Sequence, residues 1–130
     1  LNRTSQAFIA HMESRFQRPH GLNWSQFRIL QSLWLLAPMH AKDVAAVTGM
    51  SRALLSASLR PLVDAGLVAR SPDPNDRRAV RLSVTSAGAA LIADVYTAQN
   101  AAEQEWVDVL TPAERTTLEA LLRRLSESAG

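Results

Sequence analysis

MSRALLSASLRPLVDAGLVARSPDPNDRRAVRLSVTSAG, residues 50–88, joins a helical segment to a short hairpin and decides the fold. Ser51 is placed to cap a helix with its hydroxyl oxygen, and Gly66 is placed to follow the end of that helix. The segments LVARS (67–71) and AVRLSV (79–84) are then short, alternating runs typical of strands. The stretch therefore predicts a helix followed directly by a β-hairpin.

A second, shorter helix is expected just upstream. AKDVAAVTG, residues 41–49, has helical character and ends at Gly49. Two short helices joined by a tight glycine-containing turn form a helix-turn-helix, and the hairpin after them makes it a winged helix. On the second helix, small residues and arginines share the face opposite its leucines: Arg52, Ala53, Ser56, Ala57 and Arg60.

The rest of the sequence predicts helices. Apolar residues recur at helical spacing over residues 4–17, and residues 24–36 are apolar on most sides, which predicts a central buried helix capped by Asn23. Thr85 is placed to cap a long helix, and TPAE at 111–114 is a capping box that starts the last one. The expected order is four helices, a hairpin and two helices.

Residues 50–88 resemble the multiple antibiotic resistance regulator (MarR) family of bacterial transcription factors. The most specific parts are GLVAR, the Asp76-Arg77-Arg78 run and VTSAG, and LNWSQFRIL before and LTPAERTTLEALL after also match, so the resemblance covers nearly the whole chain. It implies a mainly α fold with a small β-hairpin wing, a winged helix-turn-helix with N- and C-terminal dimerisation helices. We expect one domain over 1–130, with a DNA-binding lobe at about 39–84 and dimerisation helices at about 1–20 and 86–130.

The predicted function is sequence-specific binding of double-stranded DNA. A helix with little bulk on its outer face fits the major groove, which is about 12 Å wide. Arg52 or Ser56 is suited to base edges, and Arg60 and Lys42 to phosphates. The alternative is an ordinary solvated helix face. The full set of predicted contact residues is Lys42, Ser51, Arg52, Ala53, Ser56, Arg60, Arg77, Arg78 and Arg81.

The hairpin loop is expected to project. Pro72 and Pro74 limit its freedom, and Asp76 is placed to pair with one arginine and orient it. The other guanidinium would then enter a narrow minor groove, whose negative potential attracts arginine. The resemblance implicates Arg78 most, with Arg77 as its neighbour. The alternative is a polar turn with a local ion pair.

Pro61 departs from the family pattern. It lies inside the predicted recognition helix, where proline removes one hydrogen bond and costs about 3 kcal/mol or more. We expect a bend near Ala57 and Arg60, which makes the contact assigned to Arg60 the least secure.

Charge is unevenly distributed along the chain. Residues 1–41 carry four arginines and one acid, residues 42–81 seven bases and four acids, and residues 82–130 three arginines and seven acids. The acidic last segment should lie away from phosphate. The resemblance implies a two-fold homodimer built from the terminal helices and a pseudo-palindromic operator. The alternative is that the apolar stripes of these helices form intramolecular core.

Members of the resembled family often respond to phenolic or other aromatic carboxylate ligands. The resemblance therefore implies a repressor released by a small aromatic effector. The residues proposed to contact such a ligand are a set of aromatic and cationic side chains: His11, Arg15, Trp24, Arg28, Trp34 and His40. The alternative is that the tryptophans are core and the others simply exposed.

Several function classes are not expected. The absence of cysteine excludes disulfides, thiolate metal sites and thiol-based peroxide sensing, and fits a reducing cytoplasm. No apolar run predicts a membrane span, and no export signal is recognisable. The three histidines lack metal-ligand spacing and no nucleophile or phosphate-loop motif is present, so we expect no enzyme, metal or cofactor. The remaining rival is a winged helix used for protein contacts without DNA binding.

Overall fold

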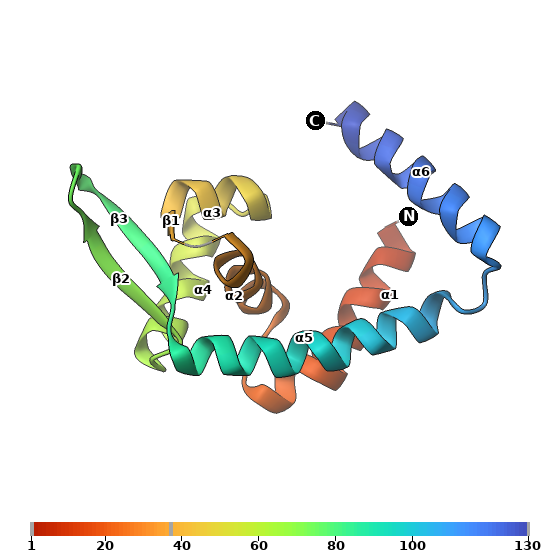
Figure 1. The fold of residues 1–130 in the computed structure, drawn as a ribbon, viewed down its shortest axis with the longest axis horizontal. Helices are drawn as coiled ribbons and strands as arrows, with labels where there is room; N and C mark the ends of the chain where they lie inside the picture. The colour runs from red at the N-terminus through yellow and green to blue at the C-terminus, as the bar shows by residue number, and fades with distance from the viewer. Residues whose placement is uncertain (1, 37, 130) are drawn as a thin grey trace. The chain divides into compact units, whose positions relative to one another are not determined.

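The computed structural model describes residues 2–36 and 38–129, and its elements follow the expected order (Figure 1). The helices are α1 (Asn2–Met12), α2 (Trp24–Leu36), α3 (Ala41–Thr48), α4 (Arg52–Asp64), α5 (Ser86–Val107) and α6 (Pro112–Ala129). The strands are β1 (Met39–His40), β2 (Val68–Asp73) and β3 (Asp76–Val84). The predicted fold class, mainly α with a small hairpin, is confirmed.

The chain divides into two compact units, Leu1–Thr97 and Ala98–Gly130. The boundary falls within α5. The first unit contains the helix-turn-helix and the hairpin, and the second contains the end of α5 and all of α6.

The first helical segment is less regular than the sequence predicted. Instead of one helix over 4–17, α1 ends at Met12 and is followed by a π-helical turn, η1 (Glu13–Gln17), and a 3-10 turn, η2 (Arg18–His20). The Arg18 amide donates to the Glu13 carbonyl, five residues earlier. The 3-10 turn runs through Pro19 and ends at Gly21, whose φ of 76° lies in the left-handed region that terminates helical segments.

Helix α2 forms the centre of the first unit. Its predicted capping box is confirmed: the Gln26 amide donates to the Asn23 side-chain oxygen at 2.9 Å, and the Asn23 amide donates to the Gln26 side chain at 3.1 Å. The Glu13 carboxylate also accepts the Trp24 amide at 2.8 Å. Because asparagine, glutamine and a carboxylate together satisfy the first amides, the helix start is well defined.

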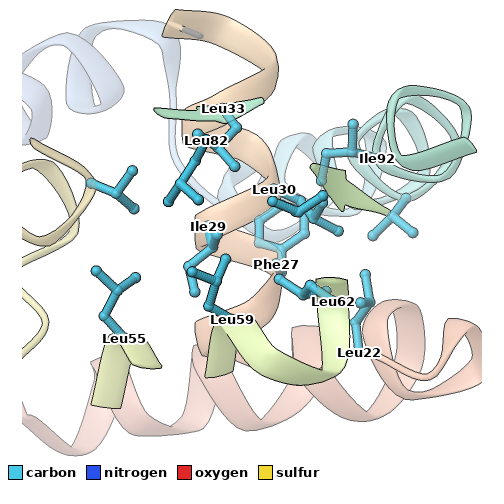
Figure 2. Close-up of a cluster of buried hydrophobic side chains, with 13 residues drawn as sticks. Leu22, Phe27, Ile29, Leu30, Leu33, Leu55, Leu59, Leu62, Leu82 and Ile92 are labelled. Carbon is cyan, nitrogen blue, oxygen red and sulfur yellow. The ribbon is translucent and has the colours of Figure 1, made fainter. Parts of the chain in front are cut away.

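A hydrophobic core joins α2 to α3, α4, the hairpin and the start of α5 (Figure 2). Leu30, Leu33, Leu82 and Ile92 are fully buried in it. The central strand β3 pairs antiparallel with β2 on one side and with the two-residue β1 on the other. The sequence did not predict β1. Leu82 pairs with Met39 and with Arg70, so the hairpin is fastened to the helices through its base.

The base of the hairpin meets the start of α5 at Gly88. The predicted cap is confirmed, since the Gly88 amide donates to the Thr85 hydroxyl at 3.0 Å. A Cβ atom on Gly88 would lie 2.1 Å from the carbonyl oxygen of Leu67 and 2.7 Å from a methyl carbon of Val84. Only glycine allows this close approach of helix to strand.

In the second unit, α6 begins at the predicted capping box. The Glu114 amide donates to the Thr111 hydroxyl at 3.2 Å, and the Thr111 amide donates to the Glu114 carboxylate at 2.9 Å. The apolar stripe of this helix stays exposed: Leu118, Leu121, Leu122 and Leu125 are 39–52% accessible.

Over residues 2–36 and 38–129, every helix is too short or too polar to cross a bilayer.

Candidate nucleic-acid interface

Helices α3 and α4 form the predicted helix-turn-helix. Gly49 ends α3 in the left-handed conformation, with φ of 72°, and Ser51 caps α4 by accepting the Leu54 amide at 3.1 Å. Three leucines anchor one face of α4 in the core: Leu55, Leu59 and Leu62. The predicted outer face is exposed over its whole length, comprising Arg52, Ala53, Ser56, Ala57 and Arg60.

Helix α4 continues through Pro61 for three more residues. The Pro61 carbonyl accepts the Ala65 amide at 3.0 Å, so the last turn is closed. The hydrogen bond that Pro61 itself lacks would have gone to the Ala57 carbonyl, which lies on the exposed side, where water can satisfy it. The effect of Pro61 on the contact assigned to Arg60 stays a prediction.

The hairpin extends farther as paired strand than the sequence predicted. Its strands continue to Asp73 and from Asp76, leaving only Pro74 and Asn75 as the turn. The pairing is irregular: Pro72 lies opposite Val80, but Asp73 lies opposite Asp76, so residues 77–79 have no counterpart on β2. Bulges of this kind re-aim side chains. Here the bulge carries the two arginines singled out in the sequence.

The predicted ion pair of Asp76 is wrong. Within the described ranges, Asp76 forms no ion pair with Arg77 or Arg78, and its carboxylate instead accepts the backbone amide of Arg78 at 3.0 Å. The residue thus shapes the backbone of the bulge, because an aspartate side chain readily accepts an amide two residues on. Both guanidinium groups remain exposed and available.

Two surface hollows connect the helices with the hairpin. One, of about 260 Å³, is lined by residues of α3 and α4 that include Lys42, Arg52 and Ser56. The other, of about 310 Å³, lies between the start of α3 and the hairpin and is lined by residues that include Lys42, Arg78 and Val80. Lys42 borders both hollows, so predicted contact residues from α3, α4 and the hairpin lie in one continuous region.

The positive charge of this region is not neutralised internally. In the described part of the chain, no ion pair involves any of the following residues: Lys42, Arg52, Arg60, Arg77 and Arg78. Three of these cations, Lys42, Arg52 and Arg78, line the two hollows together with one acid, Asp76. Exposed positive charge of this kind attracts a polyanion, and binding requires little desolvation of buried groups.

Sequence analysis did not predict the contact between His40 and Asp73. The imidazole Nε2 lies 2.6 Å from a carboxylate oxygen of Asp73, and the other oxygen accepts the Asn75 amide at 2.9 Å. The Asn75 amide, followed by His40, lowers the pKa of Asp73 below its ordinary value. Nothing in the local sequence signals this contact, because the two residues are 33 positions apart.

The six candidate partners of a small ligand do not gather at one place. Trp24 stacks on Phe27, with ring centroids 5.9 Å apart, and Trp34 packs edge-on against Tyr96 at 5.6 Å. These two tryptophans are ten residues apart on α2, about 15 Å along the axis. His11 and Arg15 are exposed, Arg28 is half-buried, and His40 contacts the hairpin. Their role in ligand binding stays a prediction.

Comparison with known proteins identifies the family. Residues 22–80 match the family model described as "MarR family". The multiple antibiotic resistance protein MarR of Escherichia coli is 30% identical over 113 residues, which cover 86% of this chain and 78% of that protein. The chain belongs to the MarR family. It is therefore a transcriptional regulator of the MarR type, in a family of regulators and not of enzymes.

Solved structures of MarR-type proteins agree with the fold. A mutant of E. coli MarR in complex with operator DNA has a TM-score of 0.87 at 28% identity, covering 95% of this chain and 89% of that one. BpsR of Bordetella bronchiseptica, whose DNA binding is regulated by 6-hydroxynicotinic acid, has a TM-score of 0.85 at 29% identity, covering 96% and 94%. The MarR fold is thus present over nearly the whole chain.

Proposed function

We propose that this chain binds double-stranded DNA in a sequence-specific manner and represses transcription until a small aromatic ligand releases it. The single observation that carries the proposal is the continuous cationic region around Lys42, to which α3, α4 and the bulge of the hairpin all contribute. The E. coli MarR complex with operator DNA, which has the same fold, supports it.

In this proposal each element has its own task. The small outer face of α4 enters the major groove, where Arg52 and Ser56 read base edges. Lys42 and Arg60 bind phosphates. The bulge brings Arg77 and Arg78 to the adjacent minor groove. The remaining proposed contacts, at the cap of α4, on its outer face and on β3, are Ser51, Ala53 and Arg81.

The decisive experiment measures affinity for a random-sequence duplex as a function of salt concentration. Each phosphate contact contributes about −0.9 to the slope of log affinity against log salt. We expect Arg78→Ala to flatten the slope by up to about 0.9. Arg123→Ala, an exposed arginine on α6, is the matched control and should leave it unchanged. A wild-type slope near zero would refute DNA binding and favour a winged helix used for protein contacts.

We also propose a two-fold homodimer formed by helices at about 1–20 and 86–130, with the lobe at about 39–84 left to bind DNA. The exposed leucine stripe of α6 supports this, because leucines that recur along one face of a helix normally pack against another surface. A symmetric dimer places its recognition helices about 34–36 Å apart on a pseudo-palindromic operator. Sedimentation of a 14.2 kDa monomer at micromolar concentration would overturn the dimer.

The proposed effector is a small aromatic or phenolic acid. Regulation of BpsR by 6-hydroxynicotinic acid supports this class of ligand. The test is release of a bound genomic fragment by 6-hydroxynicotinate and by substituted benzoates, with cyclohexanecarboxylate as the non-aromatic control. Release by the control to the same extent would argue against an aromatic effector.

A further inference from the structure

The hairpin is joined to the helix-turn-helix by few polar contacts. Strand β1 contributes only two residue pairs, between residues 39–40 and 81–82 of β3. Strand β2 lies on the far side of β3 and does not pair with β1. The His40 side chain nevertheless reaches Asp73 at the end of β2, with 2.6 Å between the imidazole Nε2 and a carboxylate oxygen. This contact therefore links the two outer strands of the sheet.

Each residue of the contact adjoins an element that carries proposed DNA-binding residues. His40 is the residue immediately before α3, and Lys42 stands in the first turn of that helix. Asp73 is the last residue of β2 before the turn, and the bulge at 77–79 follows on the returning strand. The carboxylate thus connects the start of α3 to the end of the hairpin that bears the exposed arginines.

Burial and hydrogen bonds also fix the orientation of the Asp73 carboxylate. Only 8% of its side chain is exposed, and both carboxylate oxygens accept hydrogen bonds, one from the Asn75 amide at 2.9 Å and one from the His40 Nε2–H. The neighbouring carboxylate of Asp43 lies 3.8 Å from the other imidazole nitrogen, which is too long for a hydrogen bond. Of these two carboxylates, only that of Asp73 accepts a hydrogen bond from His40.

We propose that His40 and Asp73 are positioning residues for DNA binding: their hydrogen bond fixes the bulge of the hairpin at one distance from α3, so that Arg77, Arg78 and Lys42 reach the duplex together. This inference rests on the proposed function. The hollow between α3 and the hairpin, bordered by His40, Lys42 and Arg78, is the space whose width the pair sets. Without the pair, the arginines must be ordered during binding, which weakens affinity.

The test is a double-mutant cycle on duplex affinity and its salt slope. We expect His40→Ala to weaken binding about tenfold and to flatten the salt slope by up to the contribution of the two wing arginines, about 0.9 each. In an Arg77→Ala/Arg78→Ala background, His40→Ala should have no further effect, because the residues that it positions are gone. Asp43→Ala is the matched control at the same imidazole and should retain the wild-type slope.

The outcomes separate the two proposals. A wild-type protein without salt-dependent binding would overturn the proposed function and, with it, the positioning role. If the wild type binds and the arginine variant flattens its slope, but His40→Ala weakens both backgrounds equally, only the positioning role is wrong. His40→Gln, which restores a side-chain N–H donor, should recover binding, and it also separates a lost hydrogen bond from a misfolded variant. Failure of His40→Gln to recover any binding, at an unchanged melting temperature, would likewise overturn the role.

Discussion

Replacing Gly88 with alanine should destabilise the protein, although helix propensity alone predicts the opposite. Alanine is more favourable than glycine in a helix by about 1 kcal/mol. The added Cβ, however, would lie 2.1 Å from the Leu67 carbonyl oxygen, and real Cβ contacts are essentially never closer than 3.0 Å. Helix α5 and the start of β2 must therefore separate by roughly 0.9 Å, the difference between those two distances.

The magnitude follows from the partner atom. Overpacking costs about 1–3 kcal/mol, and a backbone carbonyl, which cannot rotate away, places this site at the upper end. The same carbonyl already accepts the Thr85 amide at 3.0 Å, so its displacement strains a second contact. After subtraction of the propensity gain, the net loss of stability is about 2 kcal/mol, which lowers the melting temperature by on the order of 8 °C.

Thermal unfolding followed by circular dichroism at one fixed protein concentration measures this effect. Ala90→Gly, an exposed position on the same helix, is the control and should lose only the propensity difference of about 1 kcal/mol. A Gly88→Ala variant that melts at or above the wild-type temperature would show that α5 does not approach Leu67 as closely as described.

Two further predictions concern the core and the effect of pH. Leu82→Ala, at a fully buried position of β3, should cost about 2–5 kcal/mol of stability, whereas Val80→Ala, at 44% exposure on the same strand, should cost under about 1 kcal/mol in urea unfolding. Val80 and Leu82 share one face of β3, so equal losses would contradict the burial of Leu82 at the base of the hairpin and the exposure of Val80 toward its tip. Hydrogen bonds from the Trp24 amide and then from Arg18 lower the pKa of Glu13 in the folded protein. Ionised Glu13 therefore stabilises the fold at pH values above the glutamate pKa of the unfolded chain. This stabilisation is lost as the pH falls through the lower pKa of the folded state. The stability difference between wild type and Glu13→Gln should therefore be present at pH 7 and shrink below about pH 4; a difference that is constant with pH would refute the assignment.

Features determined by neighbouring residues were predictable from the sequence. The capping boxes at Asn23 and Thr111, the cap at Ser51 and the exposed face of α4 all depend on side chains within one helical turn of the backbone groups that they serve. The helix order and the presence of the hairpin follow from hydrophobic spacing and glycine positions, which are equally local.

Features that depend on distant residues were not predictable. Strand β1 is two residues long and exists only because β3 lies beside it. The His40–Asp73 contact spans 33 positions. The expected ion pair at Asp76 was wrong for a different reason: a backbone amide two residues away competes for the carboxylate and needs no long side chain to be ordered. For the candidate site, the sequence located the arginines but not the bulge that presents them.

The alternation along β3 limits how this hairpin can change during evolution or in engineering. Leu82 is fully buried, whereas Arg81 beside it faces solvent. Inserting or deleting one residue between Leu82 and the helices would exchange the two faces of the strand, so that the Arg81 side chain would point into the core and the Leu82 side chain toward solvent. Between Pro72 and Val80 no such constraint from the core applies, because no residue there belongs to the hydrophobic cluster. Tips of different length and sequence that keep Asp73 can therefore be grafted at that end without redesigning the core.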